Sequence, residues 1–294
     1  MSILTLLRWI ATHPLNRRQT FGPLGGLTRF VRWQLGSRLL PGRTTIPFVD
    51  RSTLLVERGM TGATGNWYCG LHEPNEMGFL LHALRPGQTF VDVGANIGSF
   101  TVLAGVVGAH VVSIEPIPQT FRRLKDNVYL NLMEGRADLL NVGISKEIGS
   151  LRFTNTFDTM NRVALPDENV ETVVVPVRTL DDTLQGRTAN LIKIDVEGHE
   201  LSVLEGATKT LADPGLNAVI METNNSGKKY GVADQQLFQK MAEHGFRPFS
   251  YDSLNRQLSP WSAGQANSIF LRDPAALESS CKSAPLFQLC NGSI

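Results

Sequence analysis

A glycine-rich turn in VDVGANIGSF, residues 91–100, could hold a nucleotide-containing ligand. Asp92 lies in an apolar segment predicted as a strand, Gly94 and Gly98 lie in the turn after it, and Glu115 closes the next predicted strand. Glycines in such a strand–turn–helix unit let a ligand approach the backbone, and an acid at the end of the second strand binds a ribose diol. The spacing predicts a nucleotide site and leaves the cofactor open.

Two residues of this segment favour S-adenosyl-L-methionine over a dinucleotide. A dinucleotide fingerprint needs glycine where this chain has Asn96, because the backbone there faces a pyrophosphate. Asp92 would place a negative charge near two phosphates, whereas the sulfonium and ammonium groups of S-adenosyl-L-methionine attract a carboxylate. The alternative that the glycines serve only a tight turn accounts for Gly94 and Gly98, but not for the acids at both strand ends.

A second set of polar residues lies in LIKIDVEGHE, residues 191–200, and in the strand predicted after it. Lys193, Asp195 and Glu197 are spaced by two, so on an extended strand they project to one face. Charges on a central strand must pair or line a cleft, and Glu222 ends the next predicted strand. We expect Asp195, Glu197, His199 and Glu222 to converge where a methyl acceptor binds, with a general base among them.

Structural roles compete with this catalytic interpretation. His199 titrates in the range a base needs, but it is also the type of polar residue found, partly exposed, in the first turn of a helix. Asp195 and Glu222 could instead pair with Lys193, which we expect to contact one of the two. A carboxylate-rich pocket could also bind a divalent cation. The sequence shows no settled set of ligands, and no metal is predicted.

The elements that position these residues alternate between strands and helices from residue 88 onward. Strands are predicted at 89–94, 110–116, 137–145, 190–198 and 217–224, and two more at 247–253 and 267–273. This alternation predicts an α/β fold with a doubly wound, mostly parallel sheet. Segments 150–156 and 172–180 have no helix between them, and Pro176 cannot donate to a ladder. We therefore expect them as a hairpin inserted at a sheet edge.

Three regions are expected along the chain. Residues 1–50 read as a basic amphipathic helical extension, residues 51–273 as the catalytic domain, and residues 274–294 as an irregular tail. Within the second region, the glycine-rich segment 61–72 is expected to be a loop.

The composition excludes several classes of protein. Hydrophobic residues make up 42% and charged residues 19%, which excludes wholesale disorder. No apolar run reaches the roughly 18 residues of a membrane span. Cys69, Cys281 and Cys290 lack CxxC spacing, so neither a disulfide framework nor a zinc site is expected. The net charge of +1 excludes a globally basic nucleic-acid binder.

The charge is unevenly distributed along the chain. Seven arginines and no acid precede Asp50. Such a segment could contact an anionic membrane and bring the site to a lipid-linked glycan, or its apolar face could pack on the catalytic domain as a lid or dimer contact. The opening residues do not read as a signal peptide. We expect a cytoplasmic protein, with peripheral contact at the inner face of the membrane as an open hypothesis.

The motifs FVDVGANIGSFT, SIEPIPQTFRRLKDNVYLN, NVGIS, LIKIDVEGHELSVLEGA and IMETN occur in this order. Together they resemble the FkbM-type family of S-adenosylmethionine-dependent methyltransferases, over about residues 68–272. The resemblance implies a seven-stranded, Rossmann-like methyltransferase sheet and S-adenosyl-L-methionine as cofactor. It assigns cofactor binding to Asp92, Gly94, Asn96, Gly98 and Glu115.

The resemblance also implies a reaction. Members of this family usually methylate a hydroxyl oxygen, often on a sugar, a glycan or a secondary metabolite, so an O-methyltransferase acting on a hydroxylated acceptor is expected. Asp195 and Glu222 fit the family pattern better than His199 does. A nicotinamide-dependent oxidoreductase and a non-catalytic S-adenosylmethionine-binding module are the alternatives. The motifs identify neither the acceptor nor the oligomeric state.

Overall fold

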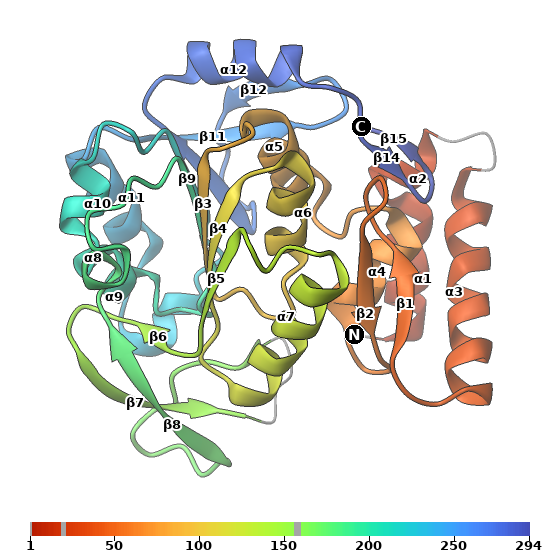
Figure 1. Cartoon of the computed structure of the whole chain (residues 1–294), viewed down its shortest axis with the longest axis horizontal. Helices are drawn as coiled ribbons and strands as arrows, with labels where there is room; N and C mark the ends of the chain where they lie inside the picture. Colours follow the sequence, from red (N-terminus) through yellow and green to blue (C-terminus); the bar gives the residue numbers. More distant parts are fainter. Residues whose placement is uncertain (1, 19–21, 156–159) are drawn as a thin grey trace.

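The computed structural model describes residues 2–18, 22–155 and 160–294, and its centre is a sheet of eight strands (Figure 1). The strand order is β12-β11-β13-β10-β9-β3-β4-β5. Neighbours from β10 to β5 are parallel, and β13, β11 and β12 add antiparallel pairs at one end. The strands are β3 (Thr89–Val93), β4 (His110–Ile114), β5 (Ala137–Leu140), β9 (Leu191–Ile194), β10 (Ala218–Glu222), β11 (Arg247–Asp252), β12 (Gln257–Pro260) and β13 (Asn267–Leu271).

The predicted doubly wound, mostly parallel α/β fold is confirmed, with one strand more than the seven expected. The additional strand is β12, which pairs antiparallel with β11 from Phe249 opposite Pro260 to Asp252 opposite Gln257. The turn between β11 and β12 holds Arg256 at a φ of 53° and folds the chain directly back on itself.

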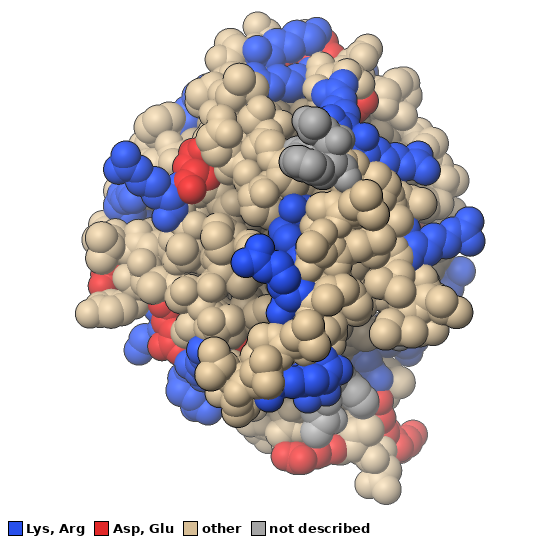
Figure 2. Space-filling model, turned by 90° about the vertical axis from the view of Figure 1, so that its right-hand side faces the viewer, with Lys and Arg blue, Asp and Glu red and all other residues tan. Residues whose placement is uncertain are grey.

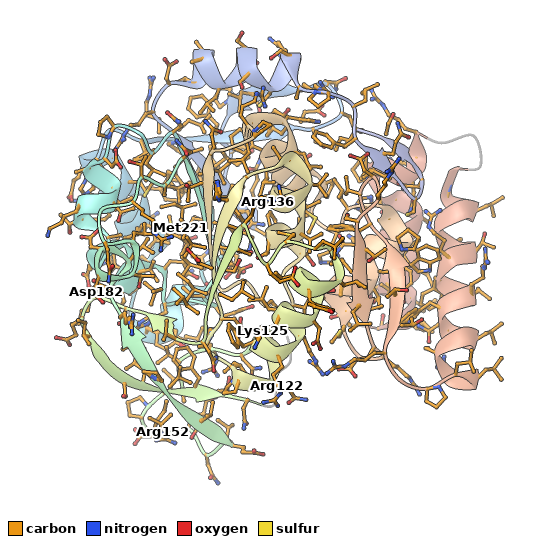
Figure 3. The ribbon with its side chains drawn as sticks, viewed as in Figure 1. Arg122, Lys125, Arg136, Arg152, Asp182 and Met221 are labelled. Carbon is orange, nitrogen blue, oxygen red and sulfur yellow. The ribbon has the colours of Figure 1, made fainter. Side chains whose placement is uncertain are left out.

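Helices cover both faces of the sheet and create two cores (Figure 1). The strand β10 shows why: Ile220 belongs to one core and the adjacent Met221 to the other, because successive side chains of a strand project to opposite faces. Met221, labelled in Figure 3, is fully buried. One face carries α5 (Pro74–Ala83), α6 (Ser99–Val107) and α7 (Pro118–Leu130), and the other carries α8 (Leu180–Leu184), α9 (Glu200–Glu205), α10 (Thr208–Ala212) and α11 (Asp234–Glu243).

The predicted edge hairpin lies in a separate three-stranded sheet, not on the main one. Its order is β6 (Gly143–Ile144), β8 (Thr172–Arg178) and β7 (Gly149–Thr154). Residue 156 of the predicted segment lies outside the described residues. The prediction that Pro176 marks an edge strand is wrong, since β8 is central. The strand tolerates proline because β6 pairs only with Val177 and Arg178, so no strand pairs with Pro176 on that side.

A layer of N-terminal helices stands beside the main sheet (Figure 1). It contains α1 (Ile3–Thr12), α2 (Pro14–Arg17) and α3 (Gly22–Leu39), next to the strands β1 (Thr44–Pro47) and β2 (Thr53–Val56). Figure 2 views this side of the molecule, where Lys and Arg side chains stand out over few acidic ones. Across the described residues, no helix is both long and apolar enough to span a bilayer.

Two expectations about irregular segments are wrong. The predicted loop 61–72 contains the helix α4 (Thr61–Cys69), and the predicted irregular tail contains the helix α12 (Pro274–Ser283) and a hairpin of β14 (Gln288–Leu289) and β15 (Gly292–Ser293). The side chain of Asn16 links these parts. Its Nδ2 donates to the carbonyls of Ile10 and Tyr68, and its Oδ1 accepts from Asn291. These bonds hold α4 and the C-terminal hairpin against the N-terminal helices.

Candidate functional site

A cavity of about 290 Å³ lies where β3, β4, β9 and β10 end. Carboxyl ends of parallel strands meet at one edge of a sheet, so the residues that follow each strand come together there. Of the residues expected at the site, seven line the cavity: Asp92, Gly94, Asn96, Glu115, Asp195, Glu197 and Glu222. Gly98 and His199 are absent from its described lining.

The glycines of the first turn are required by the local backbone. Gly94 has a φ of 83°, and a Cβ there would lie 1.9 Å from the carbonyl oxygen of Asp195. Gly98 has a φ of 91° and precedes the first residue of α6, where a Cβ would lie 2.6 Å from Leu124 Cδ1. Both glycines therefore serve the close packing of the turn, as the structural alternative supposed. Gly94 also leaves the backbone open toward the cavity.

Glu115 is held rigidly at the end of β4. Its carboxylate accepts hydrogen bonds from the backbone N–H of Asn96 at 3.0 Å and of Ile117 at 2.9 Å, one on each oxygen. The side chain is buried, and this burial raises the pKa of Glu115 to about 7 despite the two bonds. Each oxygen keeps acceptor capacity for a hydroxyl donor. The position of the Glu115 carboxylate fits the binding of a ribose diol. Asn96 helps to hold this carboxylate in place through its backbone N–H.

Asp92 is a buried acid inside β3. Its Oδ2 accepts a hydrogen bond of 2.7 Å from the Thr101 hydroxyl. Burial raises the pKa of Asp92 to about 6, while the charge of Lys193 and the bond from Thr101 oppose the increase. Lys193 is its register partner on β9. The carboxylate is thus positioned to stabilise a cationic ligand group in the cavity.

Lys193 is a buried cation that pairs with Asp195. Its Nζ lies 2.6 Å from Asp195 Oδ2 and 4.6 Å from the centre of the Phe100 ring. Burial alone would lower the pKa of Lys193, but the carboxylates of Asp195, Glu73 and Asp92 raise it above its usual value. The expectation that Lys193 contacts Asp195 or Glu222 is confirmed, with Asp195 as the partner.

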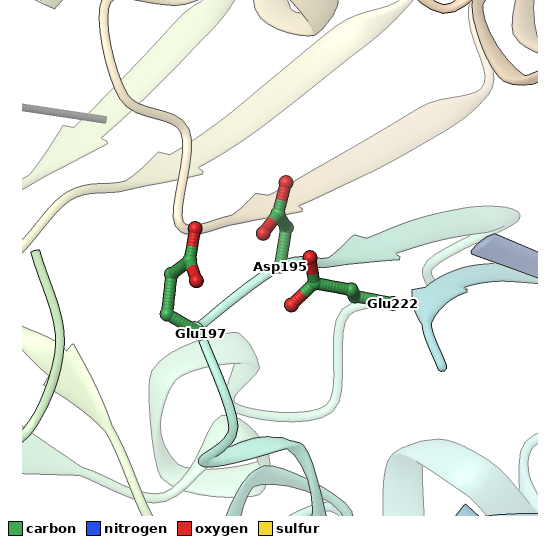
Figure 4. Close-up of side chains that lie close together, drawn as sticks. All are labelled: Asp195, Glu197 and Glu222. Carbon is green, nitrogen blue, oxygen red and sulfur yellow. The ribbon is translucent and has the colours of Figure 1, made fainter. Parts of the chain in front are cut away.

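Asp195 also belongs to a cluster of three carboxylates. One oxygen from each of Asp195, Glu197 and Glu222 lies within 4.8 Å of the others (Figure 4). Burial raises the pKa of Glu222, and the charges of Asp195 and Glu197 raise it further. Burial likewise raises the pKa of Glu197. This acidic cluster can hold a proton, or it could be neutralised by a divalent cation.

The backbone after β9 determines where the side chains of Glu197 and Glu200 lie. The strand ends at Ile194, so the prediction of a strand to residue 198 is wrong. Glu197 has a φ of 56° and Gly198 one of 104°. Glu200 stabilises this turn by accepting from the N–H groups of Val196 and Gly198. The left-handed turn brings Glu197 to the cavity, in place of the strand geometry expected from the spacing.

His199 does not converge with the acidic cluster, which corrects the expectation from the sequence. It follows the left-handed turn and precedes the first residue of α9. Its Nε2 lies 3.1 Å from the Ser145 hydroxyl, and its ring contacts Tyr230 edge-on at 6.3 Å. Burial lowers the pKa of His199 to about 4. The imidazole therefore serves the contact between α9 and the small sheet.

Several lining residues have no signal in the sequence. They come from α4 and the segments on either side of it, from β7 and from the segment between β7 and β8: Met60, Thr61, Gly62, Ala63, Asn66, His72, Glu73, Phe153 and Asn161. Glu73 accepts a hydrogen bond of 3.0 Å from Asn267. Asn127 supports the site from behind, where its side chain donates to the carbonyl of Ile97 and accepts from the N–H of Leu55.

A family model for the methyltransferase FkbM domain matches residues 92–248, more than half of the chain. The chain belongs to the FkbM methyltransferase family. It is a methyltransferase, and its cofactor is S-adenosyl-L-methionine. The resemblance drawn from the motifs is thereby confirmed.

Individual relatives are similar over about half of the chain. Hexuronic acid methyltransferase AglP of Haloferax volcanii is 31% identical over 163 residues, which span 51% of this chain and 62% of that protein. The 31-O-demethyl-FK506 methyltransferase FkbM of Streptomyces tacrolimicus is 30% identical over 203 residues, 55% of this chain and 74% of that protein. Among solved structures, P. horikoshii TYW2 in complex with MeSAdo has a TM-score of 0.45 at 15% identity, covering 87% and 86% of the two chains.

Replacing Glu115 tests the proposed role of this residue in binding the ribose. Glu115→Ala should weaken the binding of S-adenosylhomocysteine by about 1.5–3 kcal/mol, the cost of losing charge-assisted hydrogen bonds. Isothermal titration calorimetry measures the affinity, with the exposed Glu147→Ala as matched control. Unchanged affinity in a folded Glu115→Ala protein would contradict the role. NAD should not bind to either protein.

Proposed function

We propose that this methyltransferase transfers the methyl group to a hydroxyl oxygen of a carbohydrate-containing or secondary-metabolite acceptor. The acidic cluster of Asp195, Glu197 and Glu222, on the cavity wall beyond the cofactor turn, is the observation that carries the proposal. The names of the two relatives support it, since one refers to a hexuronic acid and the other to a 31-O-demethyl compound. A non-catalytic binding module would have no need of such a cluster.

The reaction requires the chain to align a hydroxyl and accept its proton. The bound cofactor supplies a methyl group already activated on a sulfonium. An alcohol is a weak nucleophile, so a carboxylate within hydrogen-bond reach assists by taking the proton as the new bond forms. Lys193 holds Asp195 in an ion pair. Glu222 is the base in this proposal, acting in its ionised form, because it lines the cavity and Lys193 is paired with Asp195 instead of with Glu222.

The function is tested by methyl transfer from radiolabelled S-adenosyl-L-methionine to glycan, glycolipid and polyketide extracts. We expect a labelled product in which the methyl group is bound to oxygen. Glu222→Gln should lower kcat at least about 100-fold, the usual contribution of general base catalysis, with S-adenosylhomocysteine affinity within about twofold of the parent. The exposed Glu243→Gln is the matched control.

Two outcomes would contradict the proposal. Full activity in Glu222→Gln would remove Glu222 as the base, and label on nitrogen or carbon would exclude the O-methylation. We also expect the rate to survive dialysis against EDTA. Loss of activity with EDTA and its recovery with Mg²⁺ would assign the acidic cluster to a cation instead.

We propose further that the outer face of α3 contacts an anionic membrane, where a lipid-linked acceptor would be presented. The inner face of α3 buries Gly26, Phe30 and Trp33. The opposite face exposes a stripe of large apolar side chains at helical spacing: Leu24, Val31, Leu35 and Leu39. The exposed Arg32 and Arg38 flank this stripe, and no acid occurs before Asp50. Apolar side chains edged by arginines match the chemistry of an anionic bilayer surface. Figure 2 shows Lys and Arg side chains on this side of the molecule.

Sedimentation with phosphatidylglycerol vesicles tests this surface. The full-length protein should bind at low salt and be released near about 0.5 M salt, where screening shortens to a few ångströms. Leu35→Glu together with Leu39→Glu should abolish binding without affecting cofactor affinity, since both side chains are exposed. Ile148→Glu, an equally exposed position on the far side of the site, is the control. Equal sedimentation of all three proteins would refute the membrane contact.

A further inference from the structure

A second cavity, of about 520 Å³, lies at the same edge of the sheet as the first. Its wall comes from residues 223–225 after β10, from the start of α11, and from the segment between β12 and β13. Because β13 pairs antiparallel with β10, the chain that enters β13 lies beside the chain that leaves β10. The volume is within the range of roughly 300–1,000 Å³ for small-molecule sites.

The two cavities adjoin at the end of β10. Glu222 lines the first cavity, and the next residue, Thr223, lines the second. Asn224 also lines the second cavity, and its Nδ2 donates a hydrogen bond of 2.7 Å to Glu222 Oε1. Asn224 is exposed, so this bond between the two walls lies at the surface. A ligand in the second cavity would therefore lie close to the acidic cluster.

The start of β13 connects the cavities in a similar way. Gln265 lines the second cavity. Asn267, two residues further on, donates a hydrogen bond of 3.0 Å to Glu73, which lines the first cavity. Contacts from two neighbouring strands therefore join the two walls.

An aromatic side chain gives the second cavity an apolar surface. Trp261 and Phe238 both line it, and 4.8 Å separates the centroids of their rings. Phe238 packs in turn on the buried Phe270 at 5.3 Å, which anchors the pair to the core. The Nε1 of Trp261 is buried without an acceptor among the described residues, and a buried donor of this kind is normally satisfied by a water or a ligand.

The polar side chains of the second cavity indicate a neutral ligand. Asn225 and Gln235 are exposed on its wall, and neither amide bonds to another described residue. Each amide therefore keeps two donors and an acceptor oxygen for a ligand. Among the described residues that line this cavity, Asp234 is the one carboxylate, and none is a lysine or an arginine. An anionic ligand group would meet no cation there.

A sugar ring matches both parts of this wall. Its hydroxyls donate and accept hydrogen bonds, as amides require, and its C–H faces are apolar and can cover an aromatic ring. We propose that the second cavity binds a neutral sugar of an oligosaccharide acceptor, next to the sugar that is methylated at the acidic cluster. This assignment rests on the proposed function and narrows the acceptor to a glycan longer than one sugar.

Two variants remove this sugar subsite in different ways. Trp261→Ala removes the aromatic surface. Asn225→Gly removes an amide and keeps the backbone, because Asn225 has a φ of 65° and glycine adopts this region readily. It decides the question if Trp261→Ala fails to fold. Tyr129→Ala removes an exposed aromatic side chain from α7, on the other face of the sheet, and is the matched control.

Binding is measured on an array of neutral and acidic monosaccharides and oligosaccharides, with the full-length protein saturated with S-adenosylhomocysteine. We expect the parent protein to bind oligosaccharides that contain a neutral sugar. Trp261→Ala should weaken this binding about tenfold, the usual effect of removing an aromatic anchor. Asn225→Gly should weaken it about fivefold, the effect of one lost hydrogen bond. Tyr129→Ala should bind as the parent does.

Kinetics with the acceptor found in the methyl-transfer screen give a second readout. Trp261→Ala should raise KM for that acceptor about tenfold and leave kcat within about twofold, because a contact away from the reacting hydroxyl contributes equally to the ground state and the transition state. The affinity for S-adenosylhomocysteine should stay within about twofold of the parent, since the cofactor does not reach the second cavity.

Three results would overturn the proposal: no glycan binding by the parent protein, glycan binding by both folded variants that equals the parent's, or an equal loss of S-adenosylhomocysteine affinity in both variants, which would show a structural effect. The proposed function is judged separately, by whether the parent methylates a hydroxyl. Methylation with unchanged variants removes the subsite alone. Glycan binding through Trp261 without methylation removes the proposed function, and with it the role of the bound sugar as an acceptor.

Discussion

One buried lysine balances the acids around the cavity, and the site depends on this balance. Lys193 lies under the cavity on β9, 2.6 Å from Asp195 and beside Asp92 in the sheet register. A buried, ionised carboxylate without a partner costs several kcal/mol. The pKa values of the other buried acids are therefore raised, which favours their neutral form. Asp92 and Glu115 show this increase. The arrangement produces an acidic cavity suited to a ligand that carries positive charge.

The backbone geometry follows from packing these groups closely. Gly94 lies against the carbonyl of Asp195, so the turn after β3 and the loop after β9 are in direct contact. Glu197 adopts a left-handed conformation, which Glu200 stabilises through two backbone N–H groups. A side chain at position 94 would separate the two segments, and with them the cofactor turn from the acidic cluster.

The positions of site residues are predicted best where the chemistry of a residue and its place in the sheet together determine where it lies. Asp92 and Glu115 follow from a strand–turn–strand pattern, and a lysine in an apolar strand requires a partner such as Asp195. The doubly wound sheet follows from the same alternation. His199 was misplaced because its direction depends on the left-handed residues before it, which the spacing does not reveal.

Long-range contacts account for the elements that the sequence did not predict. The helix α4 contains Gly62 and Gly65, which favour a loop, yet it forms because His72 packs directly on Gly65 and because Asn16 and Arg29 bind the carbonyl of Tyr68. Likewise β14 and β15 are two residues each and are held by Asn291. The contacts of Asn291 join segments more than 200 residues apart, those of α4 join residues up to 52 positions apart, and neither kind leaves a periodic pattern.

The most direct test of this charge balance is the free energy of unfolding of Lys193→Met, measured by urea denaturation from pH 5.5 to pH 8. At pH 8 the loss of the cation should cost several kcal/mol, because it leaves ionised acids buried without a partner. As the pH falls through the raised pKa of Asp92, about 6, this register partner of Lys193 takes up a proton and the cost should shrink. The exposed Lys209→Met should show no such change. A cost in Lys193→Met that is equal at both pH values would contradict the balance.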